Sequence, residues 1–261
     1  RPPATATAAA AAYDLLKNSC GSHNPYLITT RFVPRLDGQG DPYGSAWLMS
    51  QPVVVAFNDT DPQDSTRHFT LAVEPEVGAT YGVAYDLVRD QVYVAAYVKR
   101  LAELGPLGPG GIYQVDLRTG VVRPWAQLDA GADPHRMSSD FDLPAGAAVG
   151  HAGLGDIEMA ESGAELYAVN LADKLIYRFS APDGRLLGAF PHGAAGQWWA
   201  EDAAPFGLAV RGGWLYHGVV DSAVRTGERR DLRAQVYRSR FDGGAMSLVA
   251  DLALDYDRGV A

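Results

Sequence analysis

Three polar residues in the middle of the chain could act together in chemistry. Asp156 and Glu158 stand two positions apart in a strand-like segment, so one face of a strand would carry both side chains. Asn170 follows in the next strand-like segment. Such oxygens can bind calcium, and paired carboxylates can transfer protons. One hypothesis is therefore a calcium-dependent hydrolase or lactonase site. The alternative is structural, with the aspartate holding backbone amides of a neighbouring repeat unit.

Two adjacent tryptophans form a second candidate site. Trp198 and Trp199 lie in a glycine-rich connection between strand-like segments. Aromatic side chains offer a large contact area, so the pair could stack on sugar rings or anchor a partner protein. The sequence equally allows one of the two rings to pack inside the fold.

A glycosylation signal and two acidic clusters complete the candidate sites. Asn58 begins the sequon Asn58-Asp59-Thr60 in a polar stretch after a strand-like segment, so we predict glycosylation there if the protein is secreted. Loop carboxylates could also bind calcium, although neither cluster has EF-hand spacing and solvated turns are the favoured interpretation. The clusters are Asp59, Asp61 and Asp64, and Asp140 and Asp142 with nearby Asp133 and His135.

The segments that must position these residues repeat along the chain. Similar glycine-led phrases start at Tyr81, Gly155 and Phe206, and each opens a unit of four strand-like segments joined by glycine-containing turns. The units run over about 81–128, 153–190 and 205–252. This pattern predicts an all-β fold, a β-propeller built of four-stranded antiparallel blades, with a β-sandwich as the alternative. Glycine would allow close backbone approach in the innermost strands.

The remaining organisation is less regular. Residues 1–44 read as an irregular lead-in with a short helix over Ala9 to Lys17, and residues 45–261 as the propeller blades. Three clear blades are too few for a comfortable ring of six or seven. We therefore expect an incomplete ring in this chain, completed by further segments of the same polypeptide or by another chain.

Charge and hydropathy exclude several classes of partner. The net charge of -9 argues against nucleic acid, because Lys and Arg are not in excess to neutralise phosphates. The longest apolar runs are too short to span a bilayer. The single cysteine, Cys20, excludes an internal disulfide and a cysteine-rich zinc site.

Several phrases together resemble a known family. They lie between about Phe69 and Phe241 and resemble the propeller region of large extracellular surface proteins, a region that SdrD B-like repeats often accompany in bacteria. The lead-in does not match, and those repeats are absent here. The phrases are Tyr81-Gly82-Val83-Ala84-Tyr85-Asp86, Ala95-Ala96-Tyr97-Val98-Lys99-Arg100, Gly110-Gly111-Ile112-Tyr113-Gln114-Val115-Asp116, Asp133-Pro134-His135, Gly153-Leu154-Gly155-Asp156-Ile157, Leu166-Tyr167-Ala168-Val169-Asn170-Leu171-Ala172-Asp173 and Asp231-Leu232-Arg233-Ala234-Gln235-Val236-Tyr237.

The resemblance implies an extracellular or cell-surface setting and no defined reaction. The leading hypothesis is therefore a non-enzymatic structural or adhesive module of a wall, filament or appendage, in which blade loops contact partner proteins or glycans. The alternatives are the calcium-dependent hydrolase or lactonase of Asp156, Glu158 and Asn170, and a carbohydrate-binding module that uses Trp198 and Trp199.

Overall fold

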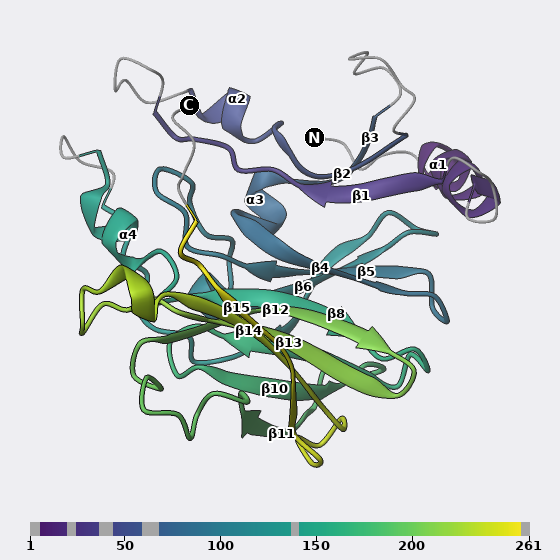
Figure 1. Ribbon diagram of the computed structural model, residues 1–261. Helices are drawn as coiled ribbons and strands as arrows, with labels where there is room; N and C mark the ends of the chain where they lie inside the picture. Colours follow the sequence, from purple (N-terminus) through teal and green to yellow (C-terminus); the bar gives the residue numbers. More distant parts are fainter. Residues whose placement is uncertain (1–5, 20–24, 37–43, 59–67, 137–140, 257–261) are drawn as a thin grey trace. The chain divides into compact units, whose positions relative to one another are not determined.

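The computed structural model describes residues 6–19, 25–36, 44–58, 68–136 and 141–256. The chain divides into two compact units, Arg1–Leu154 and Gly155–Ala261. Each unit contains two antiparallel sheets (Figure 1).

The first unit holds one three-stranded and one four-stranded sheet. The three-stranded sheet has the order β1-β2-β3, and its strands are β1 (Tyr26–Thr30), β2 (Pro52–Asn58) and β3 (Phe69–Val73). The four-stranded sheet has the order β4-β5-β6-β7, with β4 (Thr80–Asp86), β5 (Gln91–Ala96), β6 (Gly111–Asp116) and β7 (Val122–Gln127). Apolar side chains of β2, β5 and β6 share one buried core, which includes Val54, Val94 and Tyr113.

Short helices accompany the sheets of the first unit. They are α1 (Ala6–Ser19), α2 (Ser45–Leu48), α3 (Glu74–Val77), the 3-10 helix η2 (Gly108–Gly110) and α4 (Leu143–Ala148). The expected lead-in helix thus extends further at both ends than predicted, and the lead-in also contains β1, which belongs to a sheet. No helix in the described ranges is long and apolar enough to cross a membrane.

The second unit holds two four-stranded sheets. The first has the order β11-β10-β9-β8, with β8 (Leu154–Met159), β9 (Glu165–Asn170), β10 (Leu175–Ser180) and β11 (Leu186–Pro191). The second has the order β12-β13-β14-β15, with β12 (Ala203–Arg211), β13 (Trp214–Asp221), β14 (Arg233–Ser239) and β15 (Ser247–Ala253), and the 3-10 helix η3 (Arg229–Asp231) precedes β14.

All three four-stranded sheets connect their strands in sequence order, as the blades of a β-propeller do. The predicted all-β fold, a β-propeller built of four-stranded antiparallel blades, is therefore confirmed. The three sheets cover residues 80–127, 154–191 and 203–253. The N-terminal strands form a further sheet that has three strands and no repeat phrase in the sequence.

The repeated glycine phrase has a geometric reason in two of the blades. The register of β4 against β5 shifts between Thr80 and Val83, and the register of β12 against β13 shifts between Pro205 and Leu208. Each shift is a bulge, and the Tyr81-Gly82 and Phe206-Gly207 phrases lie inside these bulges. Glycine is common at bulges because it tolerates the local distortion.

The predicted close approach of the backbone holds at Gly155 but not at Gly207. A Cβ at Gly155 would lie 3.1 Å from the carbonyl oxygen of Phe206 in β12 and 3.3 Å from Val169. A Cβ at Gly207 would meet nothing within 4 Å. Crowding therefore explains the glycine at position 155, whereas the bulge explains Gly207.

Candidate functional site

The carboxylate of Asp156 is bound by backbone amides on both of its oxygens. Oδ2 accepts a hydrogen bond of 3.0 Å from the N–H of Leu208, and Oδ1 accepts one of 3.0 Å from the N–H of Ile157. Leu208 belongs to β12, so the first bond joins the two blades of the second unit. This is the structural role that the sequence left open for the aspartate.

Glu158 is the residue of this site that can change its charge near neutral pH. Burial raises the pKa of its carboxyl to about 7, and the negative charge of Asp156 adds to the effect, although the Met159 N–H opposes it. The pKa of Asp156 is also raised by burial, against its two backbone hydrogen bonds. A group with a pKa near 7 is suited to general acid/base chemistry, so Glu158 is the best candidate for proton transfer here.

Asn170 uses its amide oxygen to hold a turn. The residue is fully buried at the end of β9, and its Oδ1 accepts a hydrogen bond of 3.0 Å from the N–H of Ala172. In the part of the chain that the structure describes, no group of three or more His, Cys, Asp or Glu side chains could hold a metal ion. Calcium at Asp156, Glu158 and Asn170 stays a prediction.

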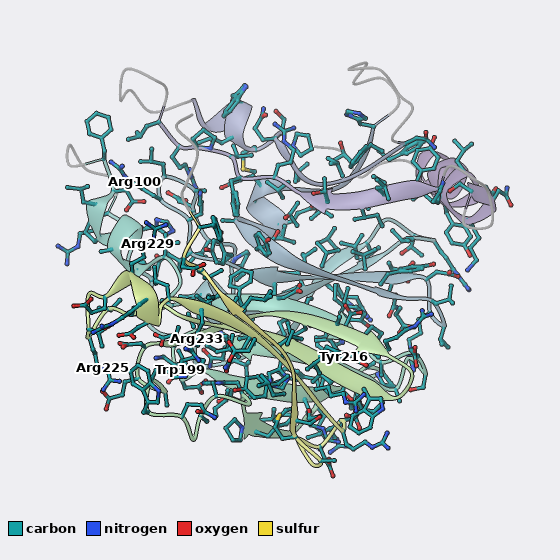
Figure 2. The ribbon with its side chains drawn as sticks, in the orientation of Figure 1. Arg100, Trp199, Tyr216, Arg225, Arg229 and Arg233 are labelled. Carbon is teal, nitrogen blue, oxygen red and sulfur yellow. The ribbon has the colours of Figure 1, made fainter. Side chains whose placement is uncertain are left out.

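The two tryptophans have opposite environments. Trp199 is 1% exposed and packs with Ala194, Val219 and Tyr237 in the core of the second unit, where Figure 2 labels it. Trp198 is 59% exposed. The sequence allowed one ring to pack inside the fold, and the structure assigns that place to Trp199 and leaves Trp198 as the ring that a ligand could reach.

Arg225 fixes the loop that carries Trp198. Its guanidinium donates to the carbonyl oxygen of Trp198 at 2.8 Å, to Oδ2 of Asp202 at 3.2 Å and to Oε2 of Glu201 at 3.2 Å. Its neighbour Val224 is 76% exposed. Arg225 thus joins two loops, and Figure 2 labels it on the second of them. We call Trp198, Val224 and Arg225 the Trp198 loop surface.

Trp198 was predicted from the sequence as a candidate binding residue, but the role of Arg225 in this surface was not. The stretch around Arg225 reads as a solvated loop because it alternates basic and acidic residues. The sequence signal nearest to it is Asp202, an acidic residue shortly after the two tryptophans. In the structure its side chain is buried, with 7% of the residue exposed. A buried carboxylate needs a cationic partner or hydrogen-bond donors, and the nearby arginines could supply them.

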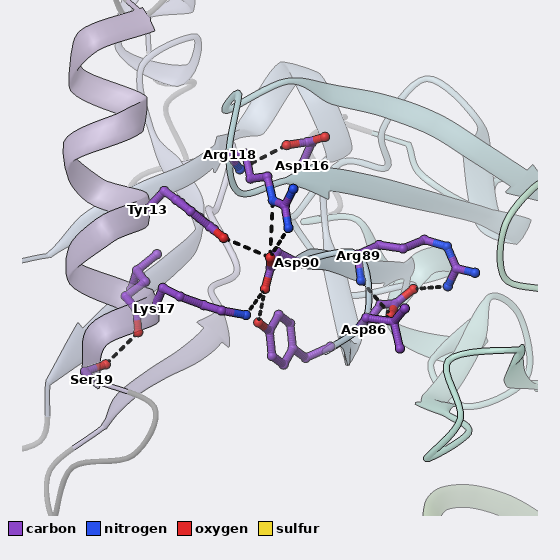
Figure 3. A network of polar contacts seen from close by, with 11 residues as sticks. Tyr13, Lys17, Ser19, Asp86, Arg89, Asp90, Asp116 and Arg118 are labelled. Carbon is purple, nitrogen blue, oxygen red and sulfur yellow. Dashed lines mark hydrogen bonds and ion pairs between the residues drawn. The ribbon is translucent and has the colours of Figure 1, made fainter.

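A second polar cluster, in the first unit, was not predicted at all. Asp90 is the last residue of the turn between β4 and β5; its φ is 55°, and its side chain is 2% exposed. It accepts hydrogen bonds from the hydroxyls of Tyr13 at 2.9 Å and Tyr85 at 3.0 Å and from Arg118 at 2.7 Å, and it pairs with Lys17 (Figure 3). We call these five residues the Asp90 cluster.

The pKa of Asp90 is shifted in the opposite direction from the pKa of Glu158. Burial works to raise the pKa of Asp90, but the hydrogen bonds from Lys17, Arg118 and the two tyrosines outweigh it and hold the pKa far below its usual range. The carboxylate stays ionised at every ordinary pH. The cluster therefore fastens α1, which carries Tyr13 and Lys17, to the turn that follows β4.

The blades that contain β5 and β9 each carry a polar group around a buried tyrosine. Tyr93 donates to Gln91 at 3.0 Å and accepts from Gln114 at 2.9 Å. Tyr167 donates to Glu165 at 2.9 Å. In both blades the tyrosine follows its partner by two positions on the second strand, which places both side chains on one face. These groups serve the packing of the blades and leave the tyrosines fully buried.

The remaining candidate residues are only partly described. Asn58 is the last residue of β2 and is half-buried, whereas Asp59, Thr60, Asp61, Asp64 and Asp140 lie outside the described residues. Oδ2 of Asp142 lies 2.8 Å from Nδ1 of His135 and accepts the N–H of Leu101 at 2.9 Å. Burial works against ionisation of Asp142, but these and further hydrogen bonds lower its pKa. Its oxygens therefore already serve the local fold.

Comparison with known proteins gives two curated relatives. The chain is 29% identical to Colossin-D of Dictyostelium discoideum over 171 residues, which cover 62% of this chain and 18% of that protein. It is 35% identical to Colossin-A of the same organism over 93 residues, which cover 34% of this chain and 1% of that protein. The chain thus spans less than a fifth of the curated relatives it matches. No protein-family model matches the chain.

Several solved structures are distantly similar. A chain of a nidogen/laminin complex is 14% identical with a TM-score of 0.49, and the match covers 87% of this chain and 62% of that chain. A protein described as putative TolB from Agrobacterium tumefaciens is 12% identical with a TM-score of 0.47, over 77% of this chain and 57% of that one.

Proposed function

We propose that this chain is a non-enzymatic extracellular module of a cell-surface assembly such as a wall, filament or appendage. Its blade loops would contact partner proteins or glycans. The observation that carries the proposal is the Trp198 loop surface, where an exposed tryptophan ring stands on a loop that Arg225 holds in place.

A fixed loop with an exposed tryptophan suits recognition for two physical reasons. Tryptophan dominates many binding interfaces because its ring buries a large area on contact. Binding also costs less when the loop is already ordered, since fewer rotations are lost. The three hydrogen-bonded contacts of Arg225 with Trp198, Glu201 and Asp202 supply that order before any partner arrives.

The interior of the blades supports the same proposal. The oxygens of Asp156 and Asn170 accept hydrogen bonds from the chain's own backbone, so these residues already have a structural task. Rigid blades of this kind are scaffolds, and scaffolds present their loops for contact.

The cell-surface setting rests on likeness in sequence. The phrases between Phe69 and Phe241 resemble propeller regions of large extracellular proteins, and the chain matches segments of Colossin-D and Colossin-A. We accordingly propose that its partners are other chains of a surface assembly, further segments of the same polypeptide, or glycans. Glycosylation at Asn58 belongs to this proposal.

Binding of the labelled chain to intact cells of the encoding organism tests the proposal. We expect saturable binding that protease treatment of the cells abolishes if the partner is a protein, and that periodate oxidation abolishes if it is a glycan. In parallel, a membrane-impermeant biotin reagent should label the native protein on whole cells. Absence of both binding and labelling would contradict the proposal.

One observation favours a second candidate function. The pKa of Glu158 is about 7, which would let it act as a general acid or base in a hydrolase or lactonase. In that case lactone or ester hydrolysis should depend on pH near 7, and the variant Glu158→Gln should lose it. Equal rates for the wild-type chain and the variant across a panel of lactones would remove this candidate.

A further inference from the structure

Two buried histidines of the second unit contact the start of the connection that carries Trp198. This connection, residues 193–202, joins β11 to β12. His192 directly follows β11, and His217 lies in β13. The two residues are 5% and 1% exposed, so their rings are largely excluded from water.

Each ring accepts a hydrogen bond from a backbone amide of this connection. The N–H of Gly193 donates to Nε2 of His217 at 3.0 Å, and the N–H of Ala194 donates to Nδ1 of His192 at 3.2 Å. A ring nitrogen that accepts a hydrogen bond carries no proton, so both imidazoles are neutral in this arrangement. Protonation would place a ring N–H against each backbone N–H and remove both hydrogen bonds.

The other ring nitrogen of His217 offers no compensation. In the neutral ring the proton is on Nδ1, because Nε2 accepts from Gly193. Nδ1 is buried and has no hydrogen-bond partner among the described residues. An imidazolium at this position would therefore lack an acceptor for its N–H groups, and burial of an unpaired charge is unfavourable.

The packing leaves no room for the connection to shift within the folded blade. A Cβ at Gly193 would lie 2.1 Å from the ring of Tyr237, so the backbone rests directly on that ring. The ring of His217 stacks on the same tyrosine with a centroid distance of 5.8 Å. Ala194 and Trp199 also pack with Tyr237 in the core of the second unit. Protonation of the pair would therefore be relieved by opening of the connection.

The groups around the pair also disfavour protonation. Burial and the positive charge of Lys174, between β9 and β10, lower the pKa of His192 to about 4. Burial and the positive charge of His192 lower the pKa of His217 to about 4. On β14, Tyr237 presents its ring to His217 and donates its hydroxyl to Gln235, which donates to Asp251 of β15 at 2.8 Å. No carboxylate of the described residues contributes to either pKa shift.

We propose that His192 and His217 form an acid-sensitive switch that releases residues 193–197 from the blade when both rings are protonated. The open connection binds two protons that the closed one excludes, so opening becomes more favourable as the pH falls. Because both pKa values are lowered in the closed state, closure is fully stabilised above the unperturbed pKa of about 6.5. This stabilisation is lost as the pH falls towards 4.

Release of residues 193–197 would reduce the order of the Trp198 loop surface. Arg225 contacts Trp198, Glu201 and Asp202, so it holds the far end of the connection, whereas the histidines hold its start. A loop that is less ordered loses more conformational entropy on binding, so binding should weaken in acid. This consequence rests on the proposed function, whereas the opening itself does not.

Hydrogen–deuterium exchange of the full chain tests the switch, with rates corrected for the intrinsic effect of pH. Between pH 7 and pH 5, protection of the amides of residues 193–197 should fall about tenfold or more for each of the two histidines. Peptides from β9 should keep their protection. Unchanged protection of residues 193–197, or an equal loss in β9, would overturn the proposal.

Variants that keep the acceptors and cannot titrate assign the effect to the pair. The amide oxygen of asparagine can replace Nδ1 of His192, and that of glutamine can replace Nε2 of His217. A chain with both His192→Asn and His217→Gln should protect residues 193–197 equally at pH 7 and pH 5. His151→Gln, at an exposed histidine of the first unit, is the control and should behave like the wild-type chain.

These variants can also contradict the assignment. A fall in protection as large as that of the wild-type chain in the folded double variant, or loss of the pH dependence in His151→Gln, would do so. Circular dichroism at pH 7 shows whether the double variant folds. If it does not, His217→Gln alone takes its place and should lose about half of the effect on a logarithmic scale.

Binding to intact cells at the two pH values separates the switch from the proposed function. The wild-type chain should bind more weakly at pH 5 than at pH 7, and the double variant should bind equally at both. Opening in acid without a change in binding would support the switch and contradict the contact role of the Trp198 loop surface. Weaker binding in acid without opening would contradict the switch.

Discussion

The interior of the blades and the Trp198 loop surface use polar groups in different ways. Inside, the carboxylates of Asp90 and Asp156 accept hydrogen bonds from the chain itself and hold elements together. On the loops, Arg225 binds the backbone of Trp198 and leaves its ring 59% exposed. Burial of a polar group therefore indicates a structural role in this chain, whereas a large exposed ring on a fixed backbone indicates a surface for contact.

The two tryptophans give the sharpest test of this difference and the largest expected effect. Trp199→Ala should lower the free energy of unfolding by about 3–5 kcal/mol, because it leaves a cavity in the core of the second unit. Trp198→Ala should change it by less than about 0.5 kcal/mol, since the ring is exposed. Urea unfolding followed by circular dichroism measures both. Similar losses of stability in the two variants would contradict the different roles assigned to Trp198 and Trp199.

The Asp90 cluster should give the next largest effect. Asp90→Asn should cost about 2–3 kcal/mol, because Lys17 and Arg118 lose their shared carboxylate. Asparagine tolerates the positive φ of this position, so the backbone is not the cause. Asp183→Asn, at an exposed turn, is the matched control and should leave the free energy of unfolding nearly unchanged. Equal costs would show that the cluster is not structural.

Asp90 should also make the free energy of unfolding depend on pH in the acidic range. Its pKa in the folded chain is below the unfolded value, so its contribution is fully present above the unfolded pKa of about 4 and is lost as the pH falls through the folded pKa. Between pH 4 and pH 2 the wild-type chain should lose more stability than Asp90→Asn, as measured by urea unfolding. Parallel losses in the two chains would contradict the lowered pKa.

Ionisation of Glu158 should lower stability as the pH rises, which is the opposite direction from Asp90, and at a higher pH. Its pKa in the folded chain is about 7, above the ordinary 4.5, so the stability it contributes is present below pH 4.5 and is lost as the pH rises through 7. Glu158→Gln cannot ionise, so it should gain stability relative to the wild-type chain between pH 5 and pH 8. A stability difference that does not change with pH would contradict the raised pKa.

The fold could be predicted from the sequence because its signals are local and repeated. Glycine-led phrases and glycine-containing turns mark each four-stranded blade, and each blade forms from neighbouring segments. The three-stranded sheet carries no such phrase. Its strands β1 and β2 are separated by a long connection, so their pairing depends on a long-range core that includes Val54 and Val94.

The sites were harder to predict because they depend on pairing between distant residues. Nothing local links Lys17 to Asp90, or Arg225 to Asp202, yet these pairs fix α1 and the Trp198 loop surface. The sequence placed Asp156 and Glu158 on one face of a strand correctly, because period-two alternation is local. It could not show that Leu208, 52 positions away, would donate to Asp156.

Binding of two single variants to intact cells tests the central claim most directly. Fluorescently labelled Trp198→Ala and Glu158→Gln chains would be titrated onto cells of the encoding organism beside the wild-type chain. Trp198→Ala should bind about tenfold or more weakly, as expected for an exposed aromatic anchor, while Glu158→Gln binds like the wild-type chain. Full binding by Trp198→Ala together with loss of binding by Glu158→Gln would contradict the account.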